Sequence, residues 1–168
     1  MQNIRISGVI KESIVDGPGI RFVIFTQGCP HMCSECHNPS THDFDGGYLT
    51  NIDNILEVIK QNPLLSGVTF SGGEPFYQAK ILSKLAKQIK NTGLNILTYT
   101  GYTFEYLINN SSEINNWKDL LEQTDILIDG PFIKEQKSLL LKFRGSSNQR
   151  IIDCKQSLKN RFVIEKEL

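Results

Sequence analysis

Short apolar segments alternate with amphipathic segments through most of this 168-residue chain. Four apolar runs, rich in β-branched and aromatic residues, predict buried strands at residues 22–26, 67–71, 94–100 and 125–129. Apolar residues spaced i, i+3, i+4, i+7 predict helices over about 51–61 and 77–91, and shorter helices are predicted at 103–109 and 117–123. Residues 3–10 alternate weakly and are expected to form an edge strand or a hairpin arm, and residues 39–49 are expected to form an irregular connection.

This alternation limits the fold. Strands that alternate with helices favour a parallel sheet with crossover helices. A closed β/α barrel needs about 250 residues, and this chain has 168. The sequence therefore predicts an α/β fold of one domain spanning residues 1–168: a partial, open parallel β/α barrel.

Several loops with distinctive residues follow the predicted strands directly. They are the cysteine-containing loop 29–37, Gly72-Gly73-Glu74-Pro75, Thr100-Gly101-Tyr102 and Asp129-Gly130. Ligands of parallel α/β folds gather outside the carboxyl ends of the strands. We therefore expect these loops to share one rim of the sheet.

Three of the four cysteines form a C-x3-C-x2-C pattern at Cys29, Cys33 and Cys36. A structural zinc site is normally closed by four protein ligands, and a four-iron cluster normally takes four cysteines. Three thiolates leave one metal corner open to a substrate or cofactor. A zinc site closed by His31 or His37 remains the alternative at this point. Cys154 lies far from this loop and is expected to be a small buried residue.

Composition excludes several classes of partner. Hydrophobic residues make up 39% of the chain and charged residues 21%, with a formal net charge of zero, so neither a nucleic-acid surface nor an anionic membrane is indicated. No apolar run approaches the roughly 20 residues that span a bilayer, and the first residues lack the apolar core of a signal peptide. A cytoplasmic location is therefore expected, where thiols stay reduced and clustered cysteines point to metal binding or catalysis.

Charge is distributed unevenly along the chain. Residues 131–168 form a basic C-terminal segment with nine Lys/Arg and four Asp/Glu, whereas residues 1–130 hold nine and fourteen. Such a segment is either a solvated face or a docking surface for an acidic partner.

The motifs taken together resemble a known superfamily. C-x3-C-x2-C followed by Gly72-Gly73-Glu74-Pro75 resembles the radical S-adenosylmethionine (SAM) enzymes. The segment Asp16-Gly17-Pro18-Gly19-Ile20-Arg21 is similar to the activating enzymes of glycyl-radical enzymes. Arg144-Gly145-Ser146-Ser147-Asn148-Gln149-Arg150 looks like the tail of the branch that activates anaerobic ribonucleoside-triphosphate reductase.

This resemblance implies a set of cofactors and contacts. It implies a [4Fe-4S] cluster held by Cys29, Cys33 and Cys36, with SAM chelating the open iron through its amino and carboxylate groups. Gly73 is expected to contact SAM through its backbone, since glycine allows close approach. The other expected SAM contacts are Glu35, Cys36, His37, Ser71, Gly72, Glu74 and Asp129.

The implied activity is removal of a hydrogen atom from a glycine of a large partner, anaerobic ribonucleoside-triphosphate reductase. A flavodoxin- or ferredoxin-type protein is the implied electron donor, and the turn at residues 16–21 is expected near the partner's glycine loop. One alternative is an activator of another glycyl-radical enzyme, such as pyruvate formate-lyase. Alternatives of other classes are a non-enzymatic zinc-binding interaction module and an iron–sulfur electron-transfer protein.

Overall fold

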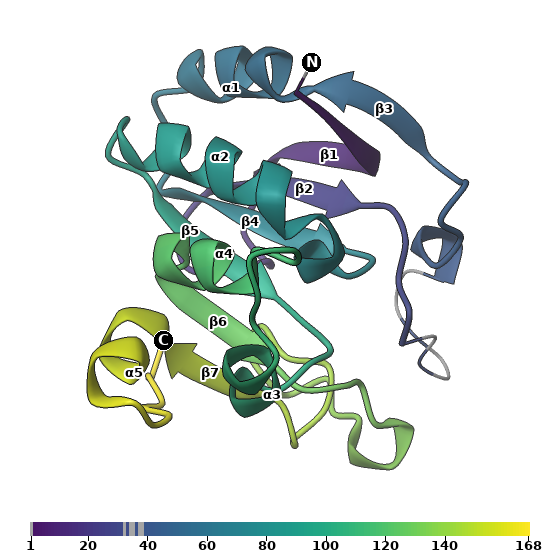
Figure 1. Cartoon of the computed structure of the whole chain (residues 1–168), viewed down its shortest axis with the longest axis vertical. Helices are drawn as coiled ribbons and strands as arrows, with labels where there is room; N and C mark the ends of the chain where they lie inside the picture. The colour runs from purple at the N-terminus through teal and green to yellow at the C-terminus, as the bar shows by residue number, and fades with distance from the viewer. Residues whose placement is uncertain (1, 32, 34–35, 37–38) are drawn as a thin grey trace.

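The computed structural model describes residues 2–31, 33, 36 and 39–168, and a seven-stranded sheet forms its centre (Figure 1). The strands are β1 (Asn3–Ser13), β2 (Arg21–Thr26), β3 (Tyr48–Asn51), β4 (Gly67–Gly72), β5 (Asn95–Tyr99), β6 (Ile126–Asp129) and β7 (Arg150–Asp153). The α-helices are α1 (Ile52–Lys60), α2 (Ala79–Lys90), α3 (Phe104–Asn109), α4 (Trp117–Gln123) and α5 (Cys154–Asn160). The order of the strands across the sheet is β3-β1-β2-β4-β5-β6-β7.

The centre of the sheet is parallel, as predicted. Strands β2, β4, β5 and β6 pair in parallel, which confirms the four predicted buried strands and their crossover helices. The flanking strands differ from this pattern, because β1, β3 and β7 pair antiparallel. The sheet is therefore mixed, and it stays open because β3 and β7 form its two outer edges.

Side chains on the parallel strands alternate between two different environments. Phe22, Ile24 and Phe70 belong to the main hydrophobic core, which also contains the buried positions of α1, α2 and α4. These helices lie along one face of the sheet (Figure 1). On the other face Leu97 and Ile128 form a smaller cluster, so the second face of the sheet is covered mainly by loops.

The helices form where the sequence predicts them. In α1 the buried residues Ile52, Ile55, Leu56 and Ile59 repeat with the helical period. Asn51 caps the helix, because its side chain accepts a hydrogen bond from Asp53 N at 2.8 Å. Of the helices that the structure describes, none is long and apolar enough to cross a membrane.

Two regions depart from the sequence prediction. Residues 48–51 form edge strand β3 within the expected irregular connection, and residues 150–160 form β7 and α5, which were not predicted. Strand β3 pairs only with β1, and its Tyr48 and Leu49 are exposed. An edge strand of this kind shows no alternation between apolar and polar residues from which it could be predicted.

Backbone hydrogen bonds join the loops at the carboxyl ends of the parallel strands. Gly73 N donates to Thr26 O at 2.7 Å and Glu74 N to Gly28 O at 2.8 Å. Thr100 N donates to Ile128 O at 2.9 Å, and Gly130 N donates to Tyr102 O at 2.8 Å. These bonds join the rim loops in two neighbouring pairs, the loops after β2 and β4 and the loops after β5 and β6.

Candidate functional site

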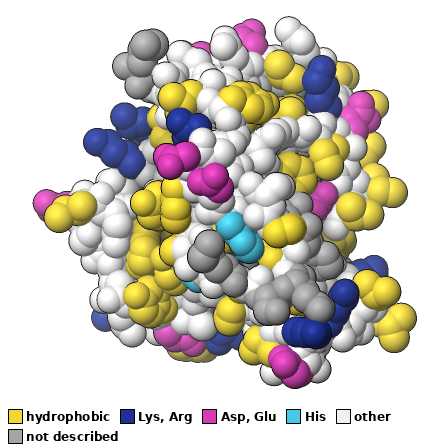
Figure 2. Space-filling model, turned by 90° about the vertical axis from the view of Figure 1, so that its right-hand side faces the viewer, with side chains coloured by type: hydrophobic (Ala, Val, Ile, Leu, Met, Phe, Trp, Pro, Cys, Tyr) yellow, Lys and Arg dark blue, Asp and Glu magenta, His cyan; other side chains and the backbone are white. Residues whose placement is uncertain are grey.

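A cavity of about 440 Å³ opens on this rim. It is lined by all three clustered cysteines and by the first part of the glycine loop: Cys29, Cys33, Cys36, Ser71, Gly72 and Gly73. Histidine side chains lie near the middle of the face shown in Figure 2, and hydrophobic side chains gather around them. Two segments about 40 residues apart in sequence thus share one cavity.

The arrangement of the cysteines bears on the kind of metal group they suit. Cys29 is buried, and Cys33 and Cys36 are half-buried. Among the described residues, no three His, Cys, Asp or Glu side chains lie close enough to share a single metal ion. The three thiols line one cavity, and this arrangement suits a four-iron cluster, which takes one thiolate per iron.

Two further residues of the cavity hold unsatisfied polar atoms. His42 Nε2 and Arg144 Nε are buried and have no hydrogen-bond partner within the described structure, and both residues line the cavity. Buried polar groups normally have partners. A polar group bound in the cavity is the nearest source of such partners, which fits a cofactor site.

Glu74 has a different place from the one predicted. Its side chain is fully buried, and it is absent from the described cavity lining. Its carboxylate accepts hydrogen bonds from Thr100 Oγ1 at 2.9 and 3.0 Å, Gly101 N at 2.8 Å and Phe76 N at 3.0 Å. His31 Nε2 lies 2.7 Å from Glu74 Oε1. With these bonds Glu74 joins three loops and has little capacity left for a ligand.

His31 is thereby fixed within the cysteine loop. Its ring packs edge-on against Tyr102 with centroids 4.4 Å apart. A side chain on Gly101 would place its Cβ 2.5 Å from His31 Cδ2, so only glycine leaves room for this ring. From its place in the sequence, His31 was expected only as a ligand of the alternative zinc site. The structure makes it the contact between the cysteine loop and the loop after β5.

Gly73 packs directly against the backbone of the loop after β2. A Cβ at this position would overlap the carbonyl of Gly28 and lie 3.0 Å from Thr41 O. The glycine loop is held there by the two backbone hydrogen bonds to Thr26 and Gly28. This close approach explains why glycine is needed at this position.

We expect Gly73→Ala to displace the loop and to lower the affinity for SAM by about tenfold or more. The added Cβ would push against rigid backbone atoms, and such overpacking typically costs about 1–3 kcal/mol. Equilibrium dialysis with labelled SAM measures the affinity. Gly8→Ala is the matched control, since a Cβ on Gly8 meets nothing within 4 Å. An affinity equal to wild type in Gly73→Ala would contradict the role of this contact.

Asp129 was predicted either to face SAM or the substrate or to cap the next loop, and its carboxylate is bonded within the protein. It is 1% exposed, and it accepts hydrogen bonds from Phe104 N at 2.8 Å and from Arg150 at 2.6 and 3.0 Å. The hydrogen bonds that Arg150 donates to Asp129 and to Glu105 raise the pKa of Arg150, and those to Glu105 lower the pKa of that carboxyl. Asp129 therefore anchors α3 and β7 beneath the rim.

The turn at residues 16–21 combines a cavity residue with a structural one. Val15 and Asp16 line the cavity. Arg21 is fully buried, and it donates to Thr69 Oγ1 at 2.8 Å, Val68 O at 3.0 Å and Pro18 O at 3.1 Å. Burial lowers the pKa of Arg21 to about 10. Arg21 thus supports the turn from below.

The segment Arg144–Arg150 returns to the cavity from the end of the chain. Arg144, Gly145 and Gln149 line it. Gln149 Oε1 accepts from Gly145 N at 2.8 Å and Ser146 N at 3.2 Å, and its Nε2 donates to Gly130 O at 3.1 Å. Tyr99 OH donates to Phe143 O at 2.6 Å, which holds the residue before Arg144. The segment closes one side of the site.

Of the predicted cofactor contacts, Glu35 and His37 lie outside the described residues. The cavity also contains residues that the sequence analysis did not assign: His31, His42, Tyr99, Phe132 and Phe143. Only their position after strands or beside the cysteines gave a signal, and that signal does not distinguish them from neighbouring loop residues.

The sequence of this chain matches a described family and several known proteins. Residues 15–152 match the family "4Fe-4S single cluster domain". The anaerobic ribonucleoside-triphosphate reductase-activating protein of Vibrio cholerae is 34% identical over 146 residues, covering 82% of this chain and 90% of that protein. The protein of the same name from Enterobacteria phage T4 is 32% identical over 143 residues, with coverage of 82% and 86%.

Other matches cover less of the relative's own length. The pyruvate formate-lyase-activating enzyme of Clostridium pasteurianum is 35% identical over 130 residues, which cover 74% of this chain but 50% of that enzyme. The crystal structure of QueE from Escherichia coli matches with a TM-score of 0.49 at 20% identity, over 61% of this chain and 55% of that one; that likeness is too distant to add to the assignment. Both the domain match and the extent of the first two alignments lead to one conclusion. The chain belongs to the 4Fe-4S single cluster domain family and to the family of anaerobic ribonucleoside-triphosphate reductase-activating proteins.

Proposed function

We propose that this chain is a radical SAM activase that generates a glycyl radical on anaerobic ribonucleoside-triphosphate reductase. The observation that carries the proposal is the shared cavity of the three clustered cysteines and the Ser71-Gly72-Gly73 segment. Family membership supports it, because two relatives whose own length is covered to 90% and 86% are named for that activation.

Different residues of this chain have different roles in the proposed reaction. Cys29, Cys33 and Cys36 would hold a [4Fe-4S] cluster at the cavity. Bound there, the cluster would supply the one-electron chemistry for reductive cleavage of SAM and removal of a hydrogen atom from the partner's glycine. Ser71, Gly72 and Gly73 bring backbone groups close to the amino acid part of SAM. Glu74 and His31 position the cysteine loop over this site.

The reductase is the better supported partner. The chain spans 90% of the Vibrio cholerae reductase-activating protein but 50% of the Clostridium pasteurianum pyruvate formate-lyase-activating enzyme. Activation of pyruvate formate-lyase is therefore the second candidate. The electron donor in this proposal is a flavodoxin- or ferredoxin-type protein, and the location is the cytoplasm, where the thiols stay reduced. The zero net charge is consistent with a function that needs neither nucleic acid nor a membrane surface.

One experiment tests this function in two stages. The protein is reconstituted anaerobically with iron and sulfide, reduced with dithionite and given SAM, and 5′-deoxyadenosine is followed by chromatography. The reductase or pyruvate formate-lyase is then added, and a glycyl radical is sought by electron paramagnetic resonance. We expect 5′-deoxyadenosine in the first stage and a radical on the reductase. A protein that binds zinc without iron and leaves SAM intact would overturn the proposal in favour of a zinc-binding module.

A further inference from the structure

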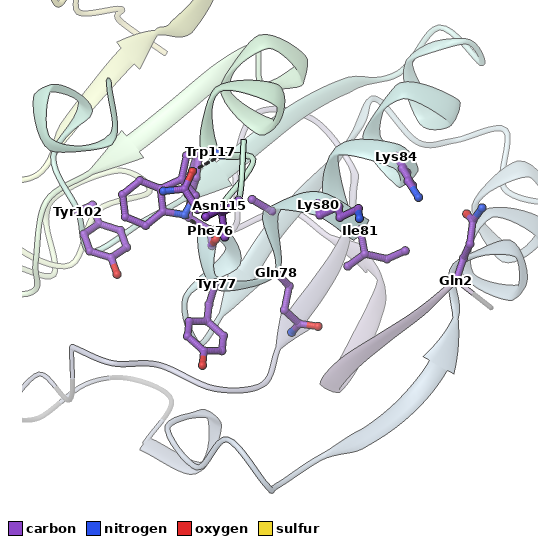
Figure 3. A pocket seen from close by; sticks show the side chains of 12 residues that line it. Gln2, Phe76, Tyr77, Gln78, Lys80, Ile81, Lys84, Tyr102, Asn115 and Trp117 are labelled. Carbon is purple, nitrogen blue, oxygen red and sulfur yellow. Dashed lines mark hydrogen bonds between the residues drawn. The ribbon is translucent and has the colours of Figure 1, made fainter. Parts of the chain in front are cut away.

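A second cavity, a groove of about 600 Å³, lies on the helix side of the sheet (Figure 3). It runs between the start of α2 and the segment that leads into α4. Phe76, Tyr77, Tyr102 and Trp117 form its aromatic part. Neither the cluster site nor the glycine loop uses this groove, so the proposed activity leaves it unexplained.

The aromatic wall of the groove is held in place by the fold. Trp117 Nε1 donates to Phe76 O at 2.9 Å, a bond drawn in Figure 3. The Tyr102 ring lies 4.9 Å from that of Trp117 and stacks on Tyr106 at 5.2 Å with an interplanar angle of 4°. Tyr77 is nevertheless 60% exposed and Ile114, on the opposite side, 93% exposed. The groove is thus a preformed surface with large apolar groups facing water.

Charge on the groove has one sign. Lys80 and Lys84 line it, and no Asp or Glu is among its described lining residues. The two lysines lie one helical turn apart on α2, so they share a face, and Figure 3 shows them along the groove beyond the aromatic residues. The remaining polar lining residues are the neutral amides Gln2, Gln78 and Asn115. An acidic surface complements this groove electrostatically.

The groove and the cysteine cavity share a wall. Tyr102 lines the groove and His31 lines the cysteine cavity, and the centroids of their rings are 4.4 Å apart. One pair of side chains therefore separates a group docked at the aromatic end from the site proposed for the cluster. Because electron-transfer rates fall steeply with distance, this short separation favours transfer from a donor in the groove to the site proposed for the cluster.

We propose that the groove docks the electron donor: a small acidic protein that carries a one-electron cofactor, its acidic rim on Lys80 and Lys84 and its cofactor edge near Tyr102. The inference rests on the proposed function, because reductive cleavage of SAM requires an electron. In this step the reduced donor loses one electron and the cluster gains it, and no bond forms or breaks. A small, transient contact suffices, as is usual for redox partners.

The reductase is a poorer occupant of the groove. Its glycine must reach the cysteine cavity, whose own rim carries exposed apolar residues: Val15 is 72% exposed, and the neighbouring Ile14 is 75% exposed. A reductase loop entering there contacts the rim on the other face of the sheet. The groove remains accessible for a donor.

The test is a double charge reversal, Lys80→Glu/Lys84→Glu, in the reconstituted protein. Reduction by photoreduced flavodoxin is followed anaerobically by stopped flow, and binding of oxidised flavodoxin is measured by calorimetry. At low ionic strength we expect reduction to slow by about tenfold or more and binding to weaken to a similar degree, because rim charges act chiefly on association. The difference from wild type should shrink as salt is added. Reduction by dithionite and dithionite-driven SAM cleavage should match wild type.

Lys159→Glu/Lys166→Glu is the matched control, with the same change of net charge at exposed positions outside the groove. Equal slowing in both double variants, or no slowing in either, would overturn the proposal. So would slower reduction by dithionite in Lys80→Glu/Lys84→Glu, which would mean a damaged cluster site. Loss of reductase activation with dithionite as reductant would assign the groove to the reductase instead. Wild-type protein that fails to cleave SAM with dithionite would refute the proposed function, independently of the groove.

Discussion

Replacing Glu74 by Gln should lower the free energy of unfolding by about 2–4 kcal/mol, because a buried carboxylate that accepts several hydrogen bonds is lost. The amide has the same size but only one oxygen, so its NH2 group faces Phe76 N or Gly101 N, which are also donors. Thr100 and His31 lose part of their pairing as well. Urea unfolding of the cluster-free protein measures this change, and iron per chain after reconstitution measures the effect on the cysteine loop.

The loss of stability in Glu74→Gln should depend on the position of Glu74 within the site and not simply on the loss of a carboxylate. Glu57→Gln removes an exposed carboxylate from α1 and is expected to change stability by less than about 0.5 kcal/mol. A double-mutant cycle of Glu74→Gln with His31→Ala should give a coupling energy of about 1 kcal/mol or more, as residues in direct contact do. Additive effects would mean that the contact between His31 and Glu74 contributes nothing to holding the cysteine loop.

Cys33→Ala and Cys36→Ala should each abolish both cluster assembly and SAM cleavage, the largest effect that we expect from any single substitution. Each variant removes one of three thiolates, so an iron of the cluster loses its ligand. Iron and sulfide analysis after anaerobic reconstitution should fall from about four irons per chain to a small residue. 5′-Deoxyadenosine should be undetectable. A variant with full iron content that still cleaves SAM would refute the ligand assignment.

Cys154→Ala is the control for these variants, and it also tests the fourth cysteine. Cys154 is fully buried, burial raises the pKa of its thiol to about 12, and its Sγ donates to Leu121 O at 3.3 Å. It should therefore behave as a small core residue. We expect normal iron content and SAM cleavage, with a loss of about 1 kcal/mol in stability.

The four parallel strands were predictable because each is a short apolar run buried on both faces of the sheet. The glycines and cysteines directly after these strands indicated the shared rim, because the carboxyl ends of parallel strands lie at the same edge of the sheet. The outer strands gave no such signal. Segment β7-α5 is short and polar, and its one local signal is Asp153 as N-cap, which accepts a hydrogen bond from Gln156 N at 3.0 Å.

The site was only partly predictable. Cys29 and Gly73 were predicted from local motifs, and both line the cavity. Glu74 and Asp129 were also predicted to contact the ligand, and the sequence did not indicate that their carboxylates pair with His31, 43 residues away, and with Arg150, 21 residues away. Partners this distant depend on the tertiary fold. A motif identifies a residue as important, but it does not distinguish a residue that touches a ligand from one that supports the site.

The open edges of the sheet bear on which step limits the rate of activation. A closed barrel must admit a macromolecular substrate through the motion of a lid, and that motion then limits turnover. Here β3 and β7 lie at opposite edges of the sheet, so the sheet does not close into a barrel around the cavity. On the proposed function, we expect the slow conformational step to lie in the partner, which must bring its glycine to the site. The rate of activation should then depend on the flexibility of the reductase. Changes in the reductase far from the contact surface should alter the rate at which this chain activates it.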